Sequence, residues 1–456
     1  MTPTPPLPTP GPTPPLPTSA PPPSAPPPSA PPPSAPPPSA PPPSAPPPSA
    51  APPSAAPASP PPASSAADNG YVGFKRARRR DRRVYLHSHP VLFALLAATR
   101  HRHTVRLGGT VLAHSRDAYL DGLTRIPLDR TAEGTTGAAA SELTGGGLLF
   151  DQSGDEHRGS RRTLADALSA DGVARLRPIW HSVLTRRLAP LATGAPIDLA
   201  DVTTEMAGAT AAALLGLDAD PHELAHAART AAAAAARTHL PGFPWPGRHT
   251  AARNAADRLT ALLTRAGSPI GPTAGSAACP AAGSAARPTA GSPVGPALAA
   301  MLAVAAINTT VAAVPRAAAW CADAGLWPYA ASAPGALTAE LLRVTAPTPL
   351  LPRVAASHGT AGGCPVRPGD RLVLVTRHAV DAHRTDPRPD APAPPEVAQL
   401  VFGSGPHACP GARLAREQMT DTLRALAPYR PSVLRSRADR RSALPGWSTL
   451  ILAPAR

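Results

Sequence analysis

The sequence predicts a mainly α-helical domain with a small β region, preceded by a disordered, proline-rich tail. Residues 21–50 are six identical copies of Pro-Pro-Pro-Ser-Ala, and proline lacks the backbone donor that helices and sheets need. Farther along, apolar residues recur at helical spacing between about residues 164 and 215, and a strongly apolar stretch predicts one long helix from about Pro296 to Ala322. Two short β-like runs flank a Gly-Gly turn at residues 108–109.

The proline-rich tail is expected to span residues 1–70. It offers few large apolar side chains to offset the entropy of ordering, so it should stay disordered and polyproline-like. Two interpretations stay open. The tail is either a ligand for a proline-recognising domain or a tether, or it is a repeat expansion without a function.

A strongly basic run follows the tail. Residues 75–83 read KRARRRDRR, and we expect residues 71–84 to form a solvated linker, with docking to a partner as the alternative. The whole chain of 456 residues has a net charge of +15, and nearly all its cations are arginines, as in proteins of GC-rich genomes. Aromatic residues do not interleave with the basic ones, so we expect no nucleic-acid partner.

The cysteines indicate a reducing compartment. Cys279, Cys321, Cys364 and Cys409 are isolated, without a C-x-x-C pair, so neither a zinc ribbon nor a thioredoxin-type site is expected. The first residues lack the basic and apolar regions of a signal peptide. The longest early apolar run, residues 91–98, is far shorter than the ~20 residues of a membrane span. We therefore expect a soluble, cytoplasmic protein without a membrane partner.

Residues 85–456 are predicted to form the folded domain. Within it, residues 266–296 are rich in Gly, Ala, Pro and Ser and predict a low-complexity loop. Short extended pieces and turns follow Arg343. A last helix is predicted from about Ala412 to Leu426.

The most specific signal is the segment from Phe402 to Gly411, which reads FGSGPHACPG. Its glycines and prolines impose a tight, stiff loop, and the glycines let the backbone approach a flat partner closely. Cys409 lies just before a predicted helix, whose N-terminus and nearby N–H groups favour thiolate over thiol. A thiolate on a rigid loop is a soft ligand that suits iron. The alternative is a buried cysteine in a turn before a helix.

This segment resembles the haem-binding loop of the cytochrome P450 family, Phe-x-x-Gly-x-(Arg/His)-x-Cys-x-Gly. Every specified position is matched, by Phe402, Gly405, His407, Cys409 and Gly411. The resemblance implies the cytochrome P450 fold and a haem b (iron protoporphyrin IX) cofactor bound by these residues. It also implies that Cys409 is the metal ligand.

A second pair of residues supports the resemblance. Glu340 and Arg343 match the family's Glu-x-x-Arg, and a spacing of three puts both side chains on one helical face. Alone, such a pair is a common surface salt bridge. The resemblance implies a buried, structural ion pair behind the haem.

Basic residues elsewhere resemble the family's partners for the haem propionates. His157 and Arg161 match its His-x-x-x-Arg, and residues four apart share a helical face. The resemblance implies that His407 and Arg353 join them. The alternative for His157 and Arg161 is an exposed basic face in a generally charged neighbourhood.

The predicted long helix contains a departure from the family. Residues 305–310 read AAINTT and resemble its oxygen-activation signature Ala-Gly-x-(Asp/Glu)-Thr-(Thr), but Ala306 replaces the glycine and Asn308 the acid. The resemblance implies a catalytic role for Thr309 and Asn308, although an amide orients water without titrating. Two alternatives stay open: Thr310 takes the key position, or Thr309 bonds back to a carbonyl one turn earlier.

The resemblance implies a haem-thiolate monooxygenase that inserts one atom of dioxygen into a small organic substrate. Electrons would come from a ferredoxin or similar donor with its reductase, because no G-x-G-x-x-G fingerprint opens a βαβ unit here. One alternative is a haem-thiolate peroxygenase, isomerase or dehydratase, which Asn308 favours. The other is a scaffold protein that acts through its proline-rich tail.

Overall fold

The computed structural model describes residues 63–146, 149–239, 247–267 and 295–455. Most of the tail predicted for residues 1–70 and of the loop predicted for residues 266–296 therefore lies outside the described residues. At the edges of these segments, residues 63–70 belong to a helix and residues 266–267 end another helix.

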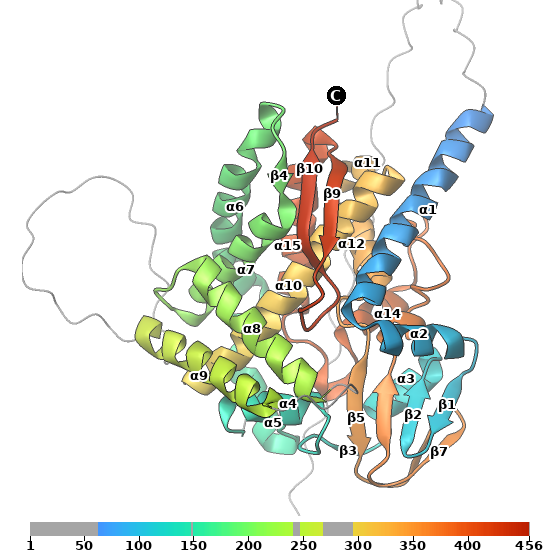
Figure 1. The fold of residues 1–456 in the computed structure, drawn as a ribbon, viewed down its shortest axis with the longest axis vertical. Helices are drawn as coiled ribbons and strands as arrows, with labels where there is room; N and C mark the ends of the chain where they lie inside the picture. Colours follow the sequence, from blue (N-terminus) through green and yellow to red (C-terminus); the bar gives the residue numbers. More distant parts are fainter. Residues whose placement is uncertain (1–62, 147–148, 240–246, 268–294, 456) are drawn as a thin grey trace, which may run out of the picture. The chain divides into compact units, whose positions relative to one another are not determined.

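Helices make up most of the described chain (Figure 1), as the helical spacing predicted. The α-helices are α1 (Ala63–Ser88), α2 (Pro90–Thr99), α3 (Arg116–Thr124), α4 (Thr136–Thr144), α5 (Gly154–Ala165), α6 (Ala170–Ala192), α7 (Leu199–Leu215), α8 (Pro221–His239), α9 (Arg248–Gly267), α10 (Pro296–Ala324), α11 (Trp327–Ser332), α12 (Pro334–Thr345), α13 (Thr376–Ala379), α14 (Pro395–Ala398) and α15 (Ala412–Leu426). Three short 3₁₀ turns are η1 (Gln399–Phe402), η2 (Gly405–His407) and η3 (Ala427–Tyr429). The predicted last helix is confirmed at both ends.

The β part is small, as predicted, and is gathered mainly in one sheet of order β1-β2-β8-β5-β3. β1 and β2 form the hairpin expected around the Gly-Gly turn, where Gly108 has a positive φ of 57°. The remaining strands pair as β4-β10-β9 and β6-β7. The strands are β1 (Thr104–Leu107), β2 (Thr110–Ala113), β3 (Leu128–Asp129), β4 (Ile197–Asp198), β5 (Leu351–Ala355), β6 (Gly359–Ala361), β7 (Cys364–Val366), β8 (Arg371–Leu374), β9 (Ser432–Ala438) and β10 (Trp447–Ala453).

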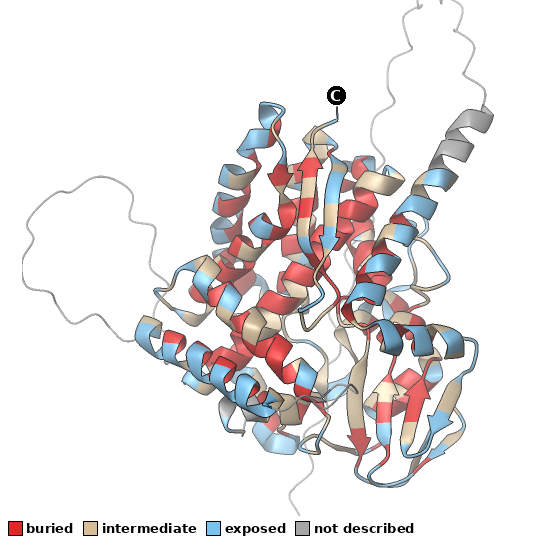
Figure 2. Cartoon of the chain, viewed as in Figure 1, coloured by how far each residue is buried: buried red, intermediate tan, exposed pale blue. Residues whose placement is uncertain are grey.

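The predicted long helix, α10, runs through the helical body. It packs against α1, α7, α8, α9, α12 and α15, and Figure 2 shows most of it as buried. Pro315 lies inside α10 and does not end it. Among the described helices, α10 alone is long and apolar enough to cross a membrane, but 67% of its most apolar window is buried by the rest of the protein. Burial of this kind is typical of a core helix.

The basic linker predicted for residues 71–84 is wrong, because these residues belong to α1, which packs on α10. The many charges hide a helical period: Ala77, Asp81 and Val84 are buried on one face. Asp81 forms a 2.7 Å ion pair with Arg316 of α10, whose side chain is fully buried. The hydroxyl of Tyr85 lies 2.6 Å from the same guanidinium.

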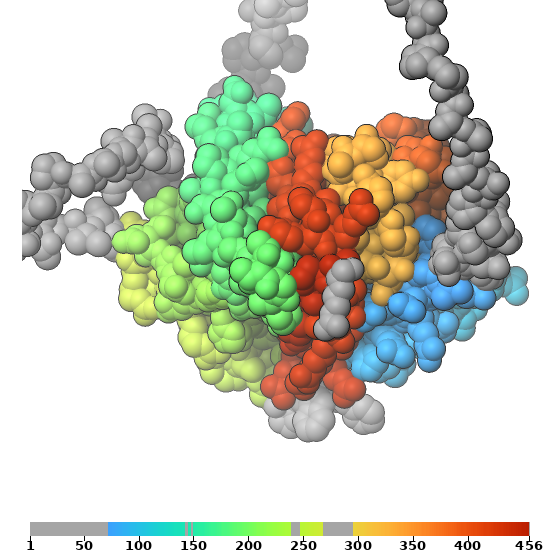
Figure 3. All heavy atoms as spheres, turned by 90° about the horizontal axis from the view of Figure 1, so that it is seen from above, coloured from blue at the N-terminus to red at the C-terminus, as the bar shows by residue number. Residues whose placement is uncertain are grey.

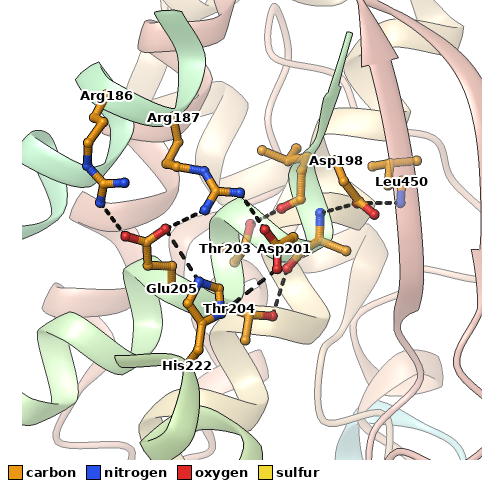
Figure 4. A network of polar contacts seen from close by, with 11 residues as sticks. Arg186, Arg187, Asp198, Asp201, Thr203, Thr204, Glu205, His222 and Leu450 are labelled. Atoms are coloured by element: carbon orange, nitrogen blue, oxygen red, sulfur yellow. Dashed lines mark hydrogen bonds and ion pairs between the residues drawn. The ribbon is translucent and has the colours of Figure 1, made fainter. Parts of the chain in front are cut away.

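Polar contacts hold α6, α7 and α8 together (Figure 4). Glu205 of α7 accepts from Arg186 and Arg187 of α6, the latter at 2.6 Å, and lies 3.5 Å from His222 of α8. Burial raises the pKa of Glu205, but the hydrogen bond and charge of Arg186 and the charge of Arg187 outweigh this and hold it below the usual value.

Seen from above (Figure 3), the C-terminal segment in red lies between α6 in green and α11–α12 in orange.

Candidate haem site

The loop before α15 is closed by its own backbone. The N–H of Cys409 donates to the carbonyl of Phe402 at 2.8 Å, and the N–H of Ala408 donates to Gly405 at 3.1 Å. Gly403 and Gly405 have φ values of 75° and 72°, which residues with a side chain rarely adopt. The stiff loop that the sequence predicted is therefore present.

Two arginines from helices hold this loop in place. Arg161 of α5 donates to the carbonyl of Ala408 at 2.6 Å. Arg416 of α15 lies over the ring of Phe402, with its guanidinium carbon 4.6 Å from the ring centroid. Arg161 thus binds the residue that precedes Cys409, and α5 contacts the cysteine loop.

The thiol of Cys409 lies between opposing influences. Desolvation raises its pKa, whereas the N–H of Gly411 and the charges of Arg161 and Arg416 lower it, and desolvation prevails. The sequence predicted the backbone N–H that lowers this pKa, but neither the charges of Arg161 and Arg416 nor the desolvation that exceeds them. Cys409 is exposed as a residue, although the protein around its thiol desolvates the sulfur.

The predicted propionate partners gather beside the loop. The rings of His157 and His407 stack with centroids 3.8 Å apart. Burial, together with the charges of Arg130, Arg353 and Arg161, lowers the pKa of His407 to about 3. The neutral imidazole is therefore the stable form, because cations surround it.

Arg353 of β5 completes this group. Its Nη1 donates to Thr136 at 3.1 Å and to the carbonyl of Pro352 at 2.8 Å, while its buried Nε has no partner among the described residues. Desolvation and the nearby charge of Arg130 lower the pKa of Arg353 to about 10. In the part of the chain that the structure describes, no carboxylate pairs with Arg130, Arg161 or Arg353.

This donor set fits haem. A group of half-buried cations, one of them with a buried N–H that has no partner among the described residues, is unfavourable by itself and favours the binding of anions. The two carboxylates of a haem supply two negative charges, and a thiol on a rigid loop supplies an axial ligand for iron. We name the group formed by the cations Arg130, Arg161 and Arg353, together with the neutral His157 and His407 beside them, the cation cluster.

The Glu340–Arg343 pair is buried, as expected. Arg343 Nη2 lies 2.7 Å from the Glu340 carboxylate, and the side chains are 3% and 1% exposed. Glu340 also accepts from the N–H groups of Arg388 and Ala393, and Arg343 donates to the carbonyl of Val380. The pair therefore fixes the segment 380–393 against α12, apart from any chemistry.

The residues of the oxygen-activation signature lie in α10. The hydroxyl of Thr309 donates to the carbonyl of Ala305 at 2.9 Å, which is the back-bonded alternative left open by the sequence. The amide of Asn308 donates to Val304 at 2.8 Å. Thr310 is partly buried in the same turn.

Asn308 also lines a small cavity that the sequence did not predict. The cavity is bounded by α8 and by the turn between β9 and β10, including Arg229 and Asp439. These two residues form a 2.8 Å ion pair. An acid thus lies near position 308 from a distant part of the chain.

No family model matches the chain. Over 131 aligned positions the chain is 36% identical to the curated protein "Putative cytochrome P450 140" of Mycobacterium tuberculosis and Mycobacterium bovis. This match covers 26% of the chain and only 28% of the length of those relatives.

Solved structures resemble the chain over most of its length. CYP175A1 from Thermus thermophilus has a TM-score of 0.63 at 20% identity, covering 81% of this chain and 96% of that one. The chain has the cytochrome P450 fold. CYP164A2 of Mycobacterium smegmatis gives a TM-score of 0.62 at 21% identity, covering 83% and 99%. The curated similarity, over 26% of the chain, is also to a cytochrome P450.

Arg130 and Arg416 were missed by sequence reasoning about this cytochrome P450 fold. Arg416 lies within the helix that follows the cysteine loop, where the family motif specifies nothing. Arg130 follows β3, whose antiparallel register pairs Asp129 with Val354, so the next step places Arg130 opposite Arg353. Only the pairing of these two distant strands reveals that contact.

Proposed function

We propose that the chain is a haem-thiolate monooxygenase that inserts one oxygen atom into a small organic substrate. The observation that carries the proposal is the juxtaposition of Cys409, on its closed loop, with the cation cluster that lacks acidic partners in the described chain. A thiolate and a propionate-binding group side by side suit one cofactor, haem b. We further propose a cytoplasmic location.

Each residue of the site has a proposed task. Cys409 would hold the iron, and the N–H of Gly411 together with Arg161 and Arg416 would stabilise the thiolate once the metal has displaced its proton. Arg353 and Arg130 would bind the propionates, with His157 and His407 as neutral donors. When bound, haem would supply reductive activation of dioxygen.

Residues of α10 would deliver protons to the site. The Thr309 hydroxyl donates to Ala305, and its lone pairs remain able to accept a hydrogen bond from water. Asn308 can hold a water but cannot supply a proton. This supports a second candidate, a peroxygenase, isomerase or dehydratase with the same ligand, because such reactions need less proton delivery.

The electrons are proposed to come from a ferredoxin or a similar protein with its reductase. One structural neighbour, P450BioI, was solved in complex with an acyl carrier protein bearing a fatty acid. A carrier-bound acyl chain is therefore one class of substrate to include in a screen. The spin-state change of the haem on substrate addition provides the measurement.

The first experiment is a carbon monoxide difference spectrum of the reduced, purified protein. We expect the red-shifted Soret band of a thiolate-ligated haem in the wild type, and its loss in Cys409→Ala. Cys321→Ala and Cys364→Ala are matched controls and should retain the band, because Cys321 is buried in the core and Cys364 lies in β7. A normal band in Cys409→Ala would refute the proposal.

The same preparation distinguishes the remaining candidates. A monooxygenase should form product with dioxygen and a reductase system, whereas a peroxygenase should do so with peroxide alone. An isomerase or dehydratase should need neither oxidant. Wild-type protein that folds but binds no haem would favour the scaffold alternative, in which the proline-rich tail is the working part.

A further inference from the structure

One exposed face of α1 takes no part in the proposed haem site. The outward residues recur at helical spacing, whereas Ala77, Asp81 and Val84 on the opposite face are buried. Figure 2 shows this division along α1. The outward face, named here the basic stripe, consists of Val72, Lys75, Arg76, Arg79, Arg82, Arg83 and Leu86.

The four arginines of the basic stripe differ in their ion pairing from the arginines beside the stripe on the same helix. Arg78 pairs with Asp386, and Arg80 pairs with Asp323, both at 2.6 Å. Arg78 and Arg80 therefore join α1 to other parts of the fold through ion pairs. Among the described residues, no carboxylate forms an ion pair with Arg76, Arg79, Arg82 or Arg83.

Exposed apolar side chains continue from the basic stripe onto α2. Leu86 is 36% exposed at the end of α1, and Val91 is 82% exposed at the start of α2, so the two flank the break between the helices. Leu95, one turn farther along α2, is 38% exposed. The sequence of α2, PVLFALLAAT, contains no charged residue. Adjacent exposed apolar side chains of this size mark an interaction surface.

We propose that the basic stripe and α2 dock this protein on an anionic lipid bilayer. The unpaired arginines would bind headgroup phosphates, while Val91, Leu95 and Leu86 would enter the boundary between headgroups and acyl chains. A nucleic acid would satisfy the arginines but not the apolar side chains. We expected no membrane partner, because the early part of the chain has no apolar run long enough to cross a bilayer. A peripheral contact with the bilayer surface does not require such a segment.

The charges and the apolar residues make separable contributions. Each cation close to an anionic surface raises binding roughly fivefold, so three of them contribute on the order of 100-fold. Partial burial of two aliphatic side chains contributes about tenfold. High salt should weaken the first contribution and leave the second largely intact.

Sedimentation of the full-length protein with vesicles tests the proposal. The wild type should bind vesicles that contain phosphatidylglycerol, bind pure phosphatidylcholine weakly, and lose affinity at high salt. The triple variant Arg79→Gln, Arg82→Gln and Arg83→Gln should bind phosphatidylglycerol vesicles on the order of 100-fold more weakly. Val91→Ser with Leu95→Ser should bind them about tenfold more weakly.

A matched control removes the same charge from the other side of the molecule. Arg175→Gln, Arg253→Gln and Arg258→Gln change exposed arginines of α6 and α9, and should leave vesicle binding nearly unchanged. An equal loss in this control would overturn the proposal, because net charge alone would then explain binding. Binding that ignores the Val91 and Leu95 changes would also overturn it, in favour of an acidic macromolecule. Wild-type protein that stays in solution with every vesicle at low salt would overturn it without reference to any variant.

Discussion

Replacing Asp81 by asparagine should destabilise the folded domain by about 3–5 kcal/mol, the usual cost of breaking a buried ion pair. Asp81 and Arg316 lie 2.7 Å apart with side chains at most 3% exposed. Without the carboxylate, the buried guanidinium of Arg316 has no counter-charge. It keeps only neutral acceptors: the amide oxygen introduced at position 81, the Tyr85 hydroxyl and, at 3.4 Å, the carbonyl of Pro445. For the roughly 360 residues that the structure describes, 1 kcal/mol corresponds to about 1.3 °C, so the melting temperature should fall by about 4–7 °C.

Thermal unfolding followed by circular dichroism provides the measurement. Asp155→Asn is the matched control, because it breaks the Asp155–Arg158 pair, whose side chains are 96% and 65% exposed. Such a pair contributes less than about 1 kcal/mol. Adding Arg316→Met to Asp81→Asn should restore part of the loss, since the unpaired charge is then gone. Equal melting temperatures for Asp81→Asn and Asp155→Asn would refute the conclusion that this pair fixes α1 to α10.

Three further predictions concern the site and a buried histidine. Arg353→Leu should weaken haem retention roughly tenfold, measured as haem content after gel filtration, with no shift of the carbon monoxide band; full retention would contradict its proposed role. Asn308→Asp should raise product formed per nicotinamide consumed, because general acid help is typically worth ~10²–10⁴ in rate; unchanged coupling would show another proton route. Burial and the charges of His383 and His114 lower the pKa of His378 to about 2. This imidazole stays neutral in the fold and gains a proton on unfolding. His378 therefore leaves the free energy of unfolding unchanged above about pH 6.5. Below that pH it lowers the free energy of unfolding by up to about 1.4 kcal/mol per pH unit. In denaturant titrations, His378→Phe should reduce the slope by up to about 1.4 kcal/mol per pH unit without abolishing it, because burial also lowers the pKa of His114 and His383 to about 4.

Local motifs predicted the parts of the site that lie close together in sequence. The spacing from Phe402 to Gly411 predicted a stiff loop, and the loop is closed by the hydrogen bond from Cys409 to Phe402. Glu340 and Arg343 are three residues apart, so a helical backbone is enough to bring their side chains into contact. In these cases the backbone geometry of one segment fixes the contact, so the sequence suffices.

Contacts between distant segments could not be predicted in this way. Arg130 meets Arg353 only through the pairing of β3 with β5. Asn308 shares a cavity with Asp439, which the β9–β10 turn brings in from the end of the chain. The prediction for residues 71–84 failed for a related reason: composition reports charge, whereas the burial of Asp81 depends on its partner in α10.

The arginine content illustrates the same limit from the functional side. Codon bias explains why arginine is frequent but not where each guanidinium lies. Arg316 is buried and paired with Asp81, so it stabilises the fold. Arg353 is largely buried without a described carboxylate, a position that is favourable only when an anion binds. Arg79 is exposed and unpaired beside apolar side chains, a position that costs the monomer little and is useful only to a partner. Burial and pairing, rather than number, therefore separate the arginines of the fold from those of the proposed cofactor site and the proposed lipid surface.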